Sequence, residues 1–315
     1  MGAVVFYGLL PRTVDLWSQV PSLRSIGLVA LIFVALLQFA SWWCSAGLDR
    51  VALPDLSRFA AITASLAANA VSRVVPAAGG ALGMRTKKRM WTAAGIEVGT
   101  AGSAIAATTF MSLATLFVLP VVTLLLALIG TPVPRSLVWV GVGGAGLFVV
   151  LFGVGMGLLT NDTVLRAVAR FAQACGAKIG RQVTAEGIEE ERDRLRVVLG
   201  RRWSSALALS VGIWAFDYLS LVAVLVALHT KPHLSVVLLA FTAAKILAMI
   251  PITPGGLGIV EAGLVGVLTL AGIPAAPALL ATLAYRIASF WLSLPTGLIA
   301  WRLVMHRRAL DTKAV

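Results

Sequence analysis

Residues 251–263 read PITPGGLGIVEAG, and they interrupt an apolar stretch that runs from residue 234 to residue 273. Two prolines and a cluster of three glycines are followed by a glutamate. In hydrocarbon, every backbone N–H and C=O needs a partner inside the protein, so such residues are tolerated only where the freed groups are buried or line a wet cavity. The alternatives are a simple kink or a short outer loop, but two prolines together with the glycine cluster favour a re-entrant hairpin.

The composition is that of a membrane protein. Of the 315 residues, 59% are hydrophobic and 12% are charged, with a mean hydropathy of +0.94, whereas soluble proteins are about half apolar and a quarter charged. The net charge of +13 comes mostly from basic residues between the apolar runs, where anionic lipid headgroups account for them. We therefore expect no nucleic-acid partner.

Apolar runs define the expected fold, since a membrane-spanning helix needs about 20 apolar residues. The pattern predicts an all-α fold, a polytopic integral membrane helix bundle forming one domain over residues 1–315. The clearest spans are expected at residues 25–47, 136–159, 204–228 and 277–301. The first should be an uncleaved anchor, because no basic segment precedes its apolar run. Residues 93–129 contain Pro120 and predict either a half-helix plus a span or one kinked helix.

The polar segment 160–203 is interpreted as a cytoplasmic loop. Its part 162–179 has the pattern of a basic amphipathic helix on the membrane surface, and 186–199 places acidic residues before basic ones, as suits a helix. Together with the basic cluster RTKKR at 85–89 and the basic tail, this loop predicts a cytoplasmic membrane protein with both termini inside. That topology puts Arg50 and Arg58 outside.

A second Gly/Pro segment, PAAGGALG at residues 76–83, resembles TPGGLG at 253–258. It breaks the apolar run 59–84 in the same way. Paired interruptions in two halves of a chain are typical of inverted-repeat transporters, whose substrate sites lie between the repeats. The pattern therefore predicts two re-entrant hairpins and an inverted repeat.

Charged residues inside apolar runs are the candidate functional residues, because each costs about 2.5 to 3.5 kcal/mol at a helix centre. The sequence offers Asp217, Lys245, Glu261 and Arg286, whose depths predict one common layer. Arg73 and Glu97 are further candidates. The alternative is a structural ion pair of Glu261 with Arg286 or Lys245, and both interpretations stay open.

Enzyme chemistry finds no support. The histidines His229, His233 and His306 fall at span ends or in the tail, so no catalytic triad or metal cluster can be placed in the membrane. The chain also has no phosphate-binding loop and no dinucleotide fingerprint. We expect no enzyme, no cofactor and no metal.

The residues quoted above resemble the lysylphosphatidylglycerol synthase transmembrane region family. The resemblance rests on PITPGGLGIVEAG, on the pair Tyr285 and Arg286 in LATLAYRIASFWLSLPTGLIAW, on Asp217 in WAFDYLSLVAVLVAL, and on Asn69 ahead of Pro76. It implies a membrane domain that flips an aminoacylated lipid between leaflets. The soluble synthase domain of the bifunctional members is absent here, so the resemblance implies no synthase activity.

The resemblance also implies a substrate-binding site. Pro251 and the second hairpin match one family motif, and the last helix matches another. The first hairpin departs from its motif, because Gly79 and Gly80 stand where an acid is often present, with Arg85 nearby. The full predicted set is Arg85, Asp217, Lys245, Pro254, Gly255, Gly256, Gly258, Glu261, Tyr285 and Arg286.

These observations predict a flippase or transporter for a lipid with a polar phospho- or glyco-headgroup, with membrane lipids as its partners. Helix N-termini at the glycine breaks would bind a phosphate, and Arg286, Arg85 and Lys245 would neutralise it. An accessory or scaffold subunit for a partner transferase is the alternative, with 162–179 as its docking face. An intramembrane transferase is the least supported interpretation.

Overall fold

The computed structural model describes residues 27–75, 78–128, 185–231, 233–249 and 253–311, together with isolated residues between 142 and 153. The regular structure in these ranges is all helical, as predicted. Four segments are long and apolar enough to cross a membrane: Leu28–Ala52, Val98–Thr123, Arg202–Ala227 and Ala275–Arg307. Segment 162–179 and nearly all of the expected span 136–159 lie outside the described residues.

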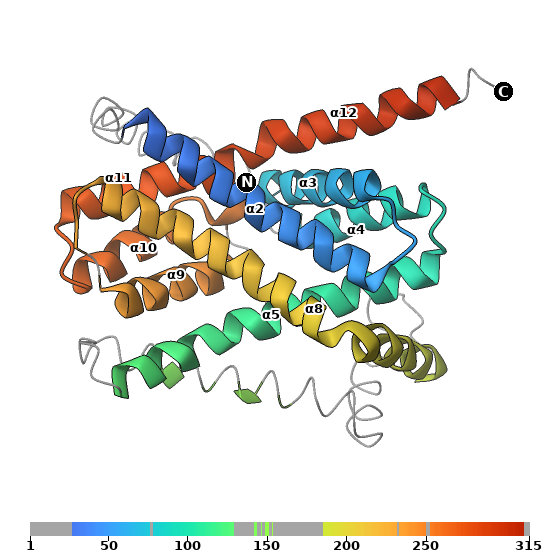
Figure 1. Cartoon of the computed structure of the whole chain (residues 1–315), viewed down its shortest axis with the longest axis horizontal. Helices are drawn as coiled ribbons and strands as arrows, with labels where there is room; N and C mark the ends of the chain where they lie inside the picture. Colours follow the sequence, from blue (N-terminus) through green and yellow to red (C-terminus); the bar gives the residue numbers. More distant parts are fainter. Residues whose placement is uncertain are drawn as a thin grey trace.

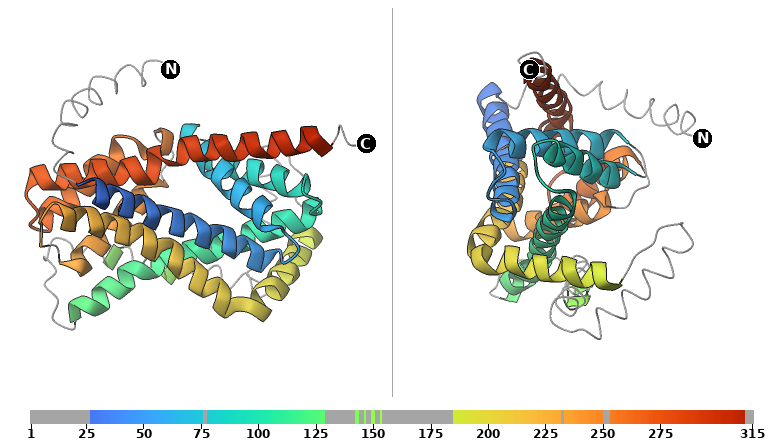
Figure 2. Two further views of the ribbon diagram at one scale, coloured as in Figure 1. Left: turned by 45° about the horizontal axis from the view of Figure 1, so that its top comes forward. Right: turned by 90° about the vertical axis from the view of Figure 1, so that its right-hand side faces the viewer.

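Two long helices, α2 (Leu28–Ala52) and α8 (Ala185–Ala227), lie side by side through the centre of the molecule (Figure 1 and Figure 2). They run antiparallel, because Gln38 contacts Asp217 while Ser41, further along α2, contacts Ile213 earlier in α8. Helix α8 includes the helix expected at 186–199. Its one non-helical residue is Arg202, with φ −131° and ψ 29°. The kink separates the polar part of α8 from its apolar part.

Helix α5 (Val98–Leu128) decides between the two predictions for residues 93–129. It is one continuous helix that contains Pro120, so the half-helix alternative is wrong. The helix begins at Val98 because the preceding residues form a turn, in which Gly95 has a φ of +92°.

Two antiparallel pairs of short helices fill the opposite halves of the molecule. The first pair is α3 (Arg58–Val74) with α4 (Gly79–Thr92), and the second is α9 (Leu234–Ala248) with α10 (Ile259–Leu270). Figure 1 shows the first pair on the right and the second on the left. Each pair turns at one of the two Gly/Pro segments. The 3₁₀ turn η2 (Pro254–Gly256) lies against α3, so the tips of the two pairs meet inside the bundle.

A long C-terminal helix passes both pairs. It consists of α11 (Ala275–Arg286), a π-helical turn η3 (Ile287–Trp291) and α12 (Ser293–Asp311). In the turn, the backbone N–H of Leu292 bonds to the carbonyl of Ile287 at 2.9 Å, so one extra residue is accommodated without a break. The left view of Figure 2 shows this helix along one edge of the molecule.

The buried core lies between the second pair and the long helices. The largest fully buried side chains there come from α8, α9 and α10: Leu221, Leu225, Phe241, Leu264 and Leu268. Because lipid is as apolar as these side chains, close van der Waals packing rather than exclusion from water stabilises such contacts between membrane helices. The core therefore holds α9 and α10 firmly against α8 and α11.

The predicted topology puts Arg50 and Arg58 on the opposite side of the membrane from the basic tail, but the structure does not separate Arg58 from that tail. The guanidinium of Arg307, near the end of α12, lies 3.8 Å from the ring centroid of Phe59, so Arg58 is at the same end of the bundle as the basic tail. The reason is that residues 59–84 do not cross the bundle: α3 runs inward and α4 returns. Helix α2 begins at the other end (Figure 1), and residues 1–26 before it lie outside the described residues.

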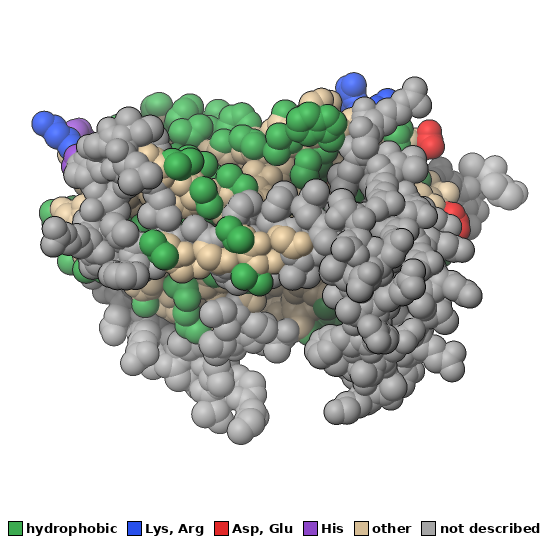
Figure 3. Space-filling model, turned by 90° about the horizontal axis from the view of Figure 1, so that it is seen from below, with side chains coloured by type: hydrophobic (Ala, Val, Ile, Leu, Met, Phe, Trp, Pro, Cys, Tyr) green, Lys and Arg blue, Asp and Glu red, His purple; other side chains and the backbone are tan. Residues whose placement is uncertain are grey.

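The surface is apolar between two charged ends. On the face shown in Figure 3, charged side chains lie toward the ends of the long axis, and hydrophobic side chains lie between them. Helix α2 exposes a run of large apolar residues: Leu28, Val29, Ile32, Phe33 and Leu36. Such a band is the surface that a bilayer covers.

Candidate functional site

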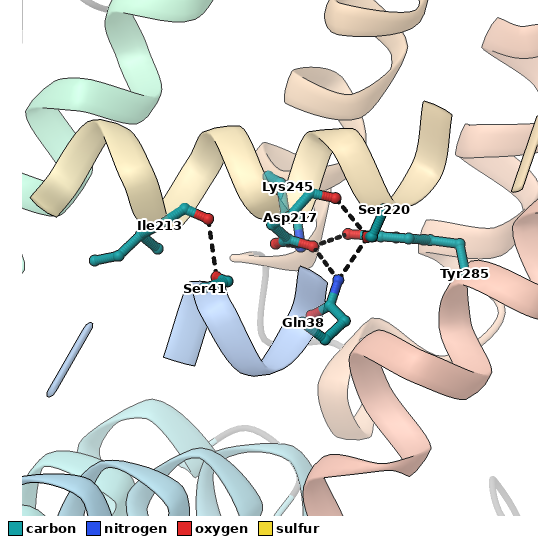
Figure 4. A network of polar contacts seen from close by, with 7 residues as sticks. All are labelled: Gln38, Ser41, Ile213, Asp217, Ser220, Lys245 and Tyr285. Atoms are coloured by element: carbon teal, nitrogen blue, oxygen red, sulfur yellow. Dashed lines mark hydrogen bonds and ion pairs between the residues drawn. The ribbon is translucent and has the colours of Figure 1, made fainter. Parts of the chain in front are cut away.

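A buried polar network links four helices of the bundle, α2, α8, α9 and α11 (Figure 4). Lys245 of α9 places its Nζ 2.5 Å from Oδ2 of Asp217 in α8. The hydroxyl of Tyr285 in α11 donates to Oδ1 of Asp217 at 2.8 Å. Gln38 of α2 donates from its Nε2 to the same Oδ1 at 2.9 Å and to the Ser220 hydroxyl at 2.7 Å. We call these five residues the Asp217 network.

Aromatic rings complete the surroundings of the Lys245 ammonium. Its Nζ lies 5.1 Å from the ring centroid of Phe241 and 5.4 Å from that of Tyr285. Both distances are within the range of cation–π attraction. The ammonium is therefore stabilised by one carboxylate and two rings.

The tip of the second hairpin requires its glycines. Gly255, Gly256 and Gly258 have φ angles of +54°, +73° and +85°, a region that side chains with a Cβ rarely adopt. At Gly255 a Cβ would collide with the Phe290 ring, and at Gly256 it would lie 2.5 Å from Cγ2 of Val260. The predicted break is therefore a tight left-handed turn that opens helix α10.

Glu261 and Arg286 fasten this turn to the long C-terminal helix. One carboxylate oxygen of Glu261 accepts a 2.7 Å hydrogen bond from the Gly258 N–H, and the other accepts one from Nε of Arg286 at 2.6 Å. Arg286 also donates from Nη2 to the Gly255 carbonyl at 3.0 Å. We call Gly255, Gly258, Glu261 and Arg286 the tip clamp. Its acid lies in the first turn of α10, where a negative charge suits the helix dipole.

The first hairpin uses its glycines differently. A Cβ on Gly79 would collide with the Ser72 carbonyl, and one on Gly83 would lie 2.8 Å from the Ala68 carbonyl. These glycines, four residues apart, thus let α4 pack closely on α3, as small residues do between membrane helices. Pro76 and Pro251 lie outside the described residues.

The predicted site residues are only partly brought together. The Asp217 network and the tip clamp hold all of the predicted polar residues except Arg85, and the two are joined by Tyr285 and Arg286, which are consecutive in α11. Arg85 is exposed on α4 and makes no hydrogen bond or ion pair with the described residues. Pro254 begins the η2 turn. The alternative pairing of Glu261 with Lys245 is wrong, since each has another partner.

Arg73 belongs near this site, although it was absent from the predicted set. It lies in the last turn of α3, and its guanidinium is 5.7 Å from the centroid of Phe290. Arg286 approaches the same ring at 4.7 Å. The signal in the sequence was its position inside an apolar run, three residues before Pro76.

A third buried ion pair was not predicted from the sequence. Lys87 of α4 lies 2.7 Å from Oδ1 of Asp49 in α2, and the Ser65 hydroxyl donates to Oδ2 of Asp49 at 2.6 Å. This pair holds the first hairpin to α2. Within the described ranges, no three histidine, cysteine, aspartate or glutamate side chains are grouped so that they could hold a metal.

Comparison with known proteins places the chain in a family. The family described as "Lysylphosphatidylglycerol synthase TM region" matches residues 2–297, nearly the whole chain. The chain belongs to this family. The matched residues include the Asp217 network and the tip clamp. The resemblance seen in the sequence to the lysylphosphatidylglycerol synthase TM region is therefore confirmed.

Two curated proteins also match parts of this chain. Both are described as "UPF0104 membrane protein" from Methanothermobacter thermautotrophicus (strain Delta H), with 35% identity over 92 residues and 27% over 139 residues. The matches cover 29% and 44% of this chain. The chain spans only 26% and 41% of the lengths of these relatives. They agree with a membrane protein and name no substrate.

Proposed function

We propose that the protein moves a polar-headed lipid across the cytoplasmic membrane. The observation that carries the proposal is the meeting of the two hairpin tips beside a layer of buried charges. Substrate sites of inverted-repeat transporters lie at such meeting points of interrupted helices. The Asp217 network and the tip clamp would then line the path of the headgroup, while the acyl chains remain in the bilayer.

Helix lengths support re-entrant hairpins. At about 1.5 Å per residue, the four helices of the two pairs extend roughly 18 to 26 Å, less than the hydrocarbon thickness of about 30 Å. A helix pair of that length can enter and leave on one side. Because the two pairs occupy opposite halves of the molecule (Figure 1), we propose that they enter from opposite sides as an inverted repeat.

Charge distribution supports an orientation. Basic residues collect where the start of α3 lies against the C-terminal part of α12: Arg58 precedes Phe59, whose ring contacts Arg307, and Arg302 lies in the same part of α12. Loops rich in lysine and arginine remain cytoplasmic. We therefore place this end, including the C-terminal tail, in the cytoplasm.

The buried ion pairs support a role beyond packing. A charge at membrane depth is expensive and usually marks a pathway or a partner. Tyr285 contacts the Asp217–Lys245 pair, and the next residue of α11, Arg286, pairs with Glu261. The two ion pairs therefore lie near each other and would hold a polar route open between the hairpins. Rearrangement of either hairpin would expose that route to one side at a time, as in alternating access. This role needs no catalytic step.

A reconstitution assay tests the proposal. Proteoliposomes would carry lipids with fluorescent headgroups, and dithionite added outside would quench those that reach the outer leaflet. Wild type should raise the quenched fraction above that of empty liposomes. Glu261→Gln, which keeps the side-chain size but removes the charge that holds Arg286, should lower the rate at least about tenfold, the effect of losing roughly 1.4 kcal/mol.

The matched control is Glu97→Gln. Glu97 is exposed before α5 and accepts a hydrogen bond only from Thr100 among the described residues. It should transport like wild type. Equal rates for Glu261→Gln and wild type would remove Glu261 from the mechanism. Folded wild type with no activity above empty liposomes would favour the accessory-subunit alternative.

A further inference from the structure

The cations assigned to a phosphate by sequence are already engaged. Arg286 is held by Glu261 and by the Gly255 carbonyl, and Lys245 is held by Asp217. The Gly258 N–H, which begins α10, is bonded to Glu261. A headgroup would have to break these bonds before it could use the same donors.

Arg73 is a cation without such a partner. Among the described residues, no carboxylate forms an ion pair with it, and its guanidinium contacts the Phe290 ring that Arg286 also contacts. Glu261 already neutralises the charge of Arg286, so Arg73 carries the positive charge at this ring that has no ion-pair partner among the described residues. The Arg73 side chain is half-buried, so water screens its charge only in part.

A second unused donor lies on the opposite tip. Oγ1 of Thr253 is buried and has no hydrogen-bond partner in the part of the chain that the structure describes. Thr253 is two residues before Gly255, whose position is in contact with the Phe290 ring. A buried hydroxyl without a partner destabilises the fold. An anion between the tips would accept hydrogen bonds from both Thr253 and Arg73.

The charges of the site define the anion. Arg73, Lys245 and Arg286 carry three positive charges, and Asp217 and Glu261 carry two negative ones, which leaves a net charge of one positive unit. A phosphodiester carries one negative charge. A phosphomonoester carries about 1.5 to 2 at neutral pH, more than this site balances.

We propose that Arg73 and Thr253 bind the phosphodiester group of a lipid headgroup between the two hairpin tips. The inference rests on the proposed function and deepens it by naming the substrate class, monoanionic phosphodiester lipids. The two residues come from opposite hairpins. A bound phosphodiester would therefore draw the tips together, which couples headgroup recognition to movement of the hairpins.

Binding is measured separately from transport. The purified protein in a neutral detergent would be titrated with fluorescent phosphatidylglycerol, and the bound probe would be displaced with unlabelled phosphatidylglycerol, phosphatidic acid, diacylglycerol or inorganic phosphate. Arg73→Gln should weaken probe binding about tenfold or more, as expected for losing hydrogen bonds to a charged group. Arg73→Lys should recover part of the affinity, and Thr253→Val should weaken binding about threefold or more.

The matched control is Arg58→Gln, at the exposed first turn of the same helix as Arg73. It should bind the probe as wild type does. Unchanged binding by a folded Arg73→Gln variant would overturn the proposal, as would better displacement by phosphatidic acid than by phosphatidylglycerol. Displacement by inorganic phosphate as efficient as by lipid would overturn the lipid assignment. Arg73-dependent binding without transport would support this inference while rejecting translocation.

Discussion

Asp217 and Lys245 form an ion pair between α8 and α9, with 2.5 Å between Oδ2 and Nζ. Both side chains are largely buried, at 11% and 20% exposure. Their desolvation is compensated only while both charges are present. Each charge thus offsets the free-energy cost of burying the other.

Removal of one partner should therefore cost far more than removal of both. Lys245→Met leaves the Asp217 carboxylate without its cation and should destabilise the folded protein by about 3 to 5 kcal/mol. The double variant Asp217→Asn with Lys245→Met should recover much of that loss. Thermal unfolding in detergent measures both. Lys231→Met, at an exposed position, is the control, and additive losses in the double variant would contradict a coupled pair.

Gly255 should be nearly irreplaceable. Gly255→Ala forces a Cβ into the Phe290 ring at a φ of +54°, at a cost of about 1 to 3 kcal/mol. Gly266→Ala, in the same hairpin at a helical position with open space around it, should be neutral or stabilising by up to about 1 kcal/mol. Unfolding curves of the two variants compare these costs. Equal stabilities would show that the turn adapts to a side chain.

The position of the first hairpin predicts which introduced cysteines are labelled from the same side of the membrane. Asp55→Cys, between α2 and α3, should react with a membrane-impermeant maleimide from the same side as a cysteine at Arg307, because the two ends lie together. Lys231→Cys, between α8 and α9, should react from the other side. Labelling of sealed vesicles of both orientations, in a background without Cys44 and Cys175, measures this. Reaction of the Asp55 and Arg307 sites from opposite sides would contradict the fold.

The sequence predicted the second hairpin well because its signals are local. A cluster of prolines and glycines favours a break in a helix, so the end of α9 and the start of α10 could be located around residues 251–258. The charges in apolar runs also included the four residues that form two of the buried ion pairs, Asp217 with Lys245 and Glu261 with Arg286. Glu261 with Arg286 was one of two pairings considered, and only the three-dimensional arrangement selects between them.

Other features depend on packing between distant segments. Gln38 and Asp49 lie in what reads as an ordinary apolar helix, and nothing near them in the chain indicates their partners Asp217 and Lys87. The role of Arg73 depends on the place of Phe290, more than 200 residues away. The glycines at 79 and 83 carried a readable signal of close helix packing, their spacing of four, but the likeness of their segment to TPGGLG was interpreted only as a break in an apolar run.

The π-helical turn at Ile287–Trp291 makes the length of the chain there more critical than its composition. An α-helix turns about 100° per residue, so loss of one residue from this turn would rotate α12 by that angle relative to α11. Arg286 would keep its place in the tip clamp, while α12 would present a different face to α3. A substitution in this turn would alter single contacts. A deletion would instead rotate α12 out of register with α3 while α11 keeps its contacts.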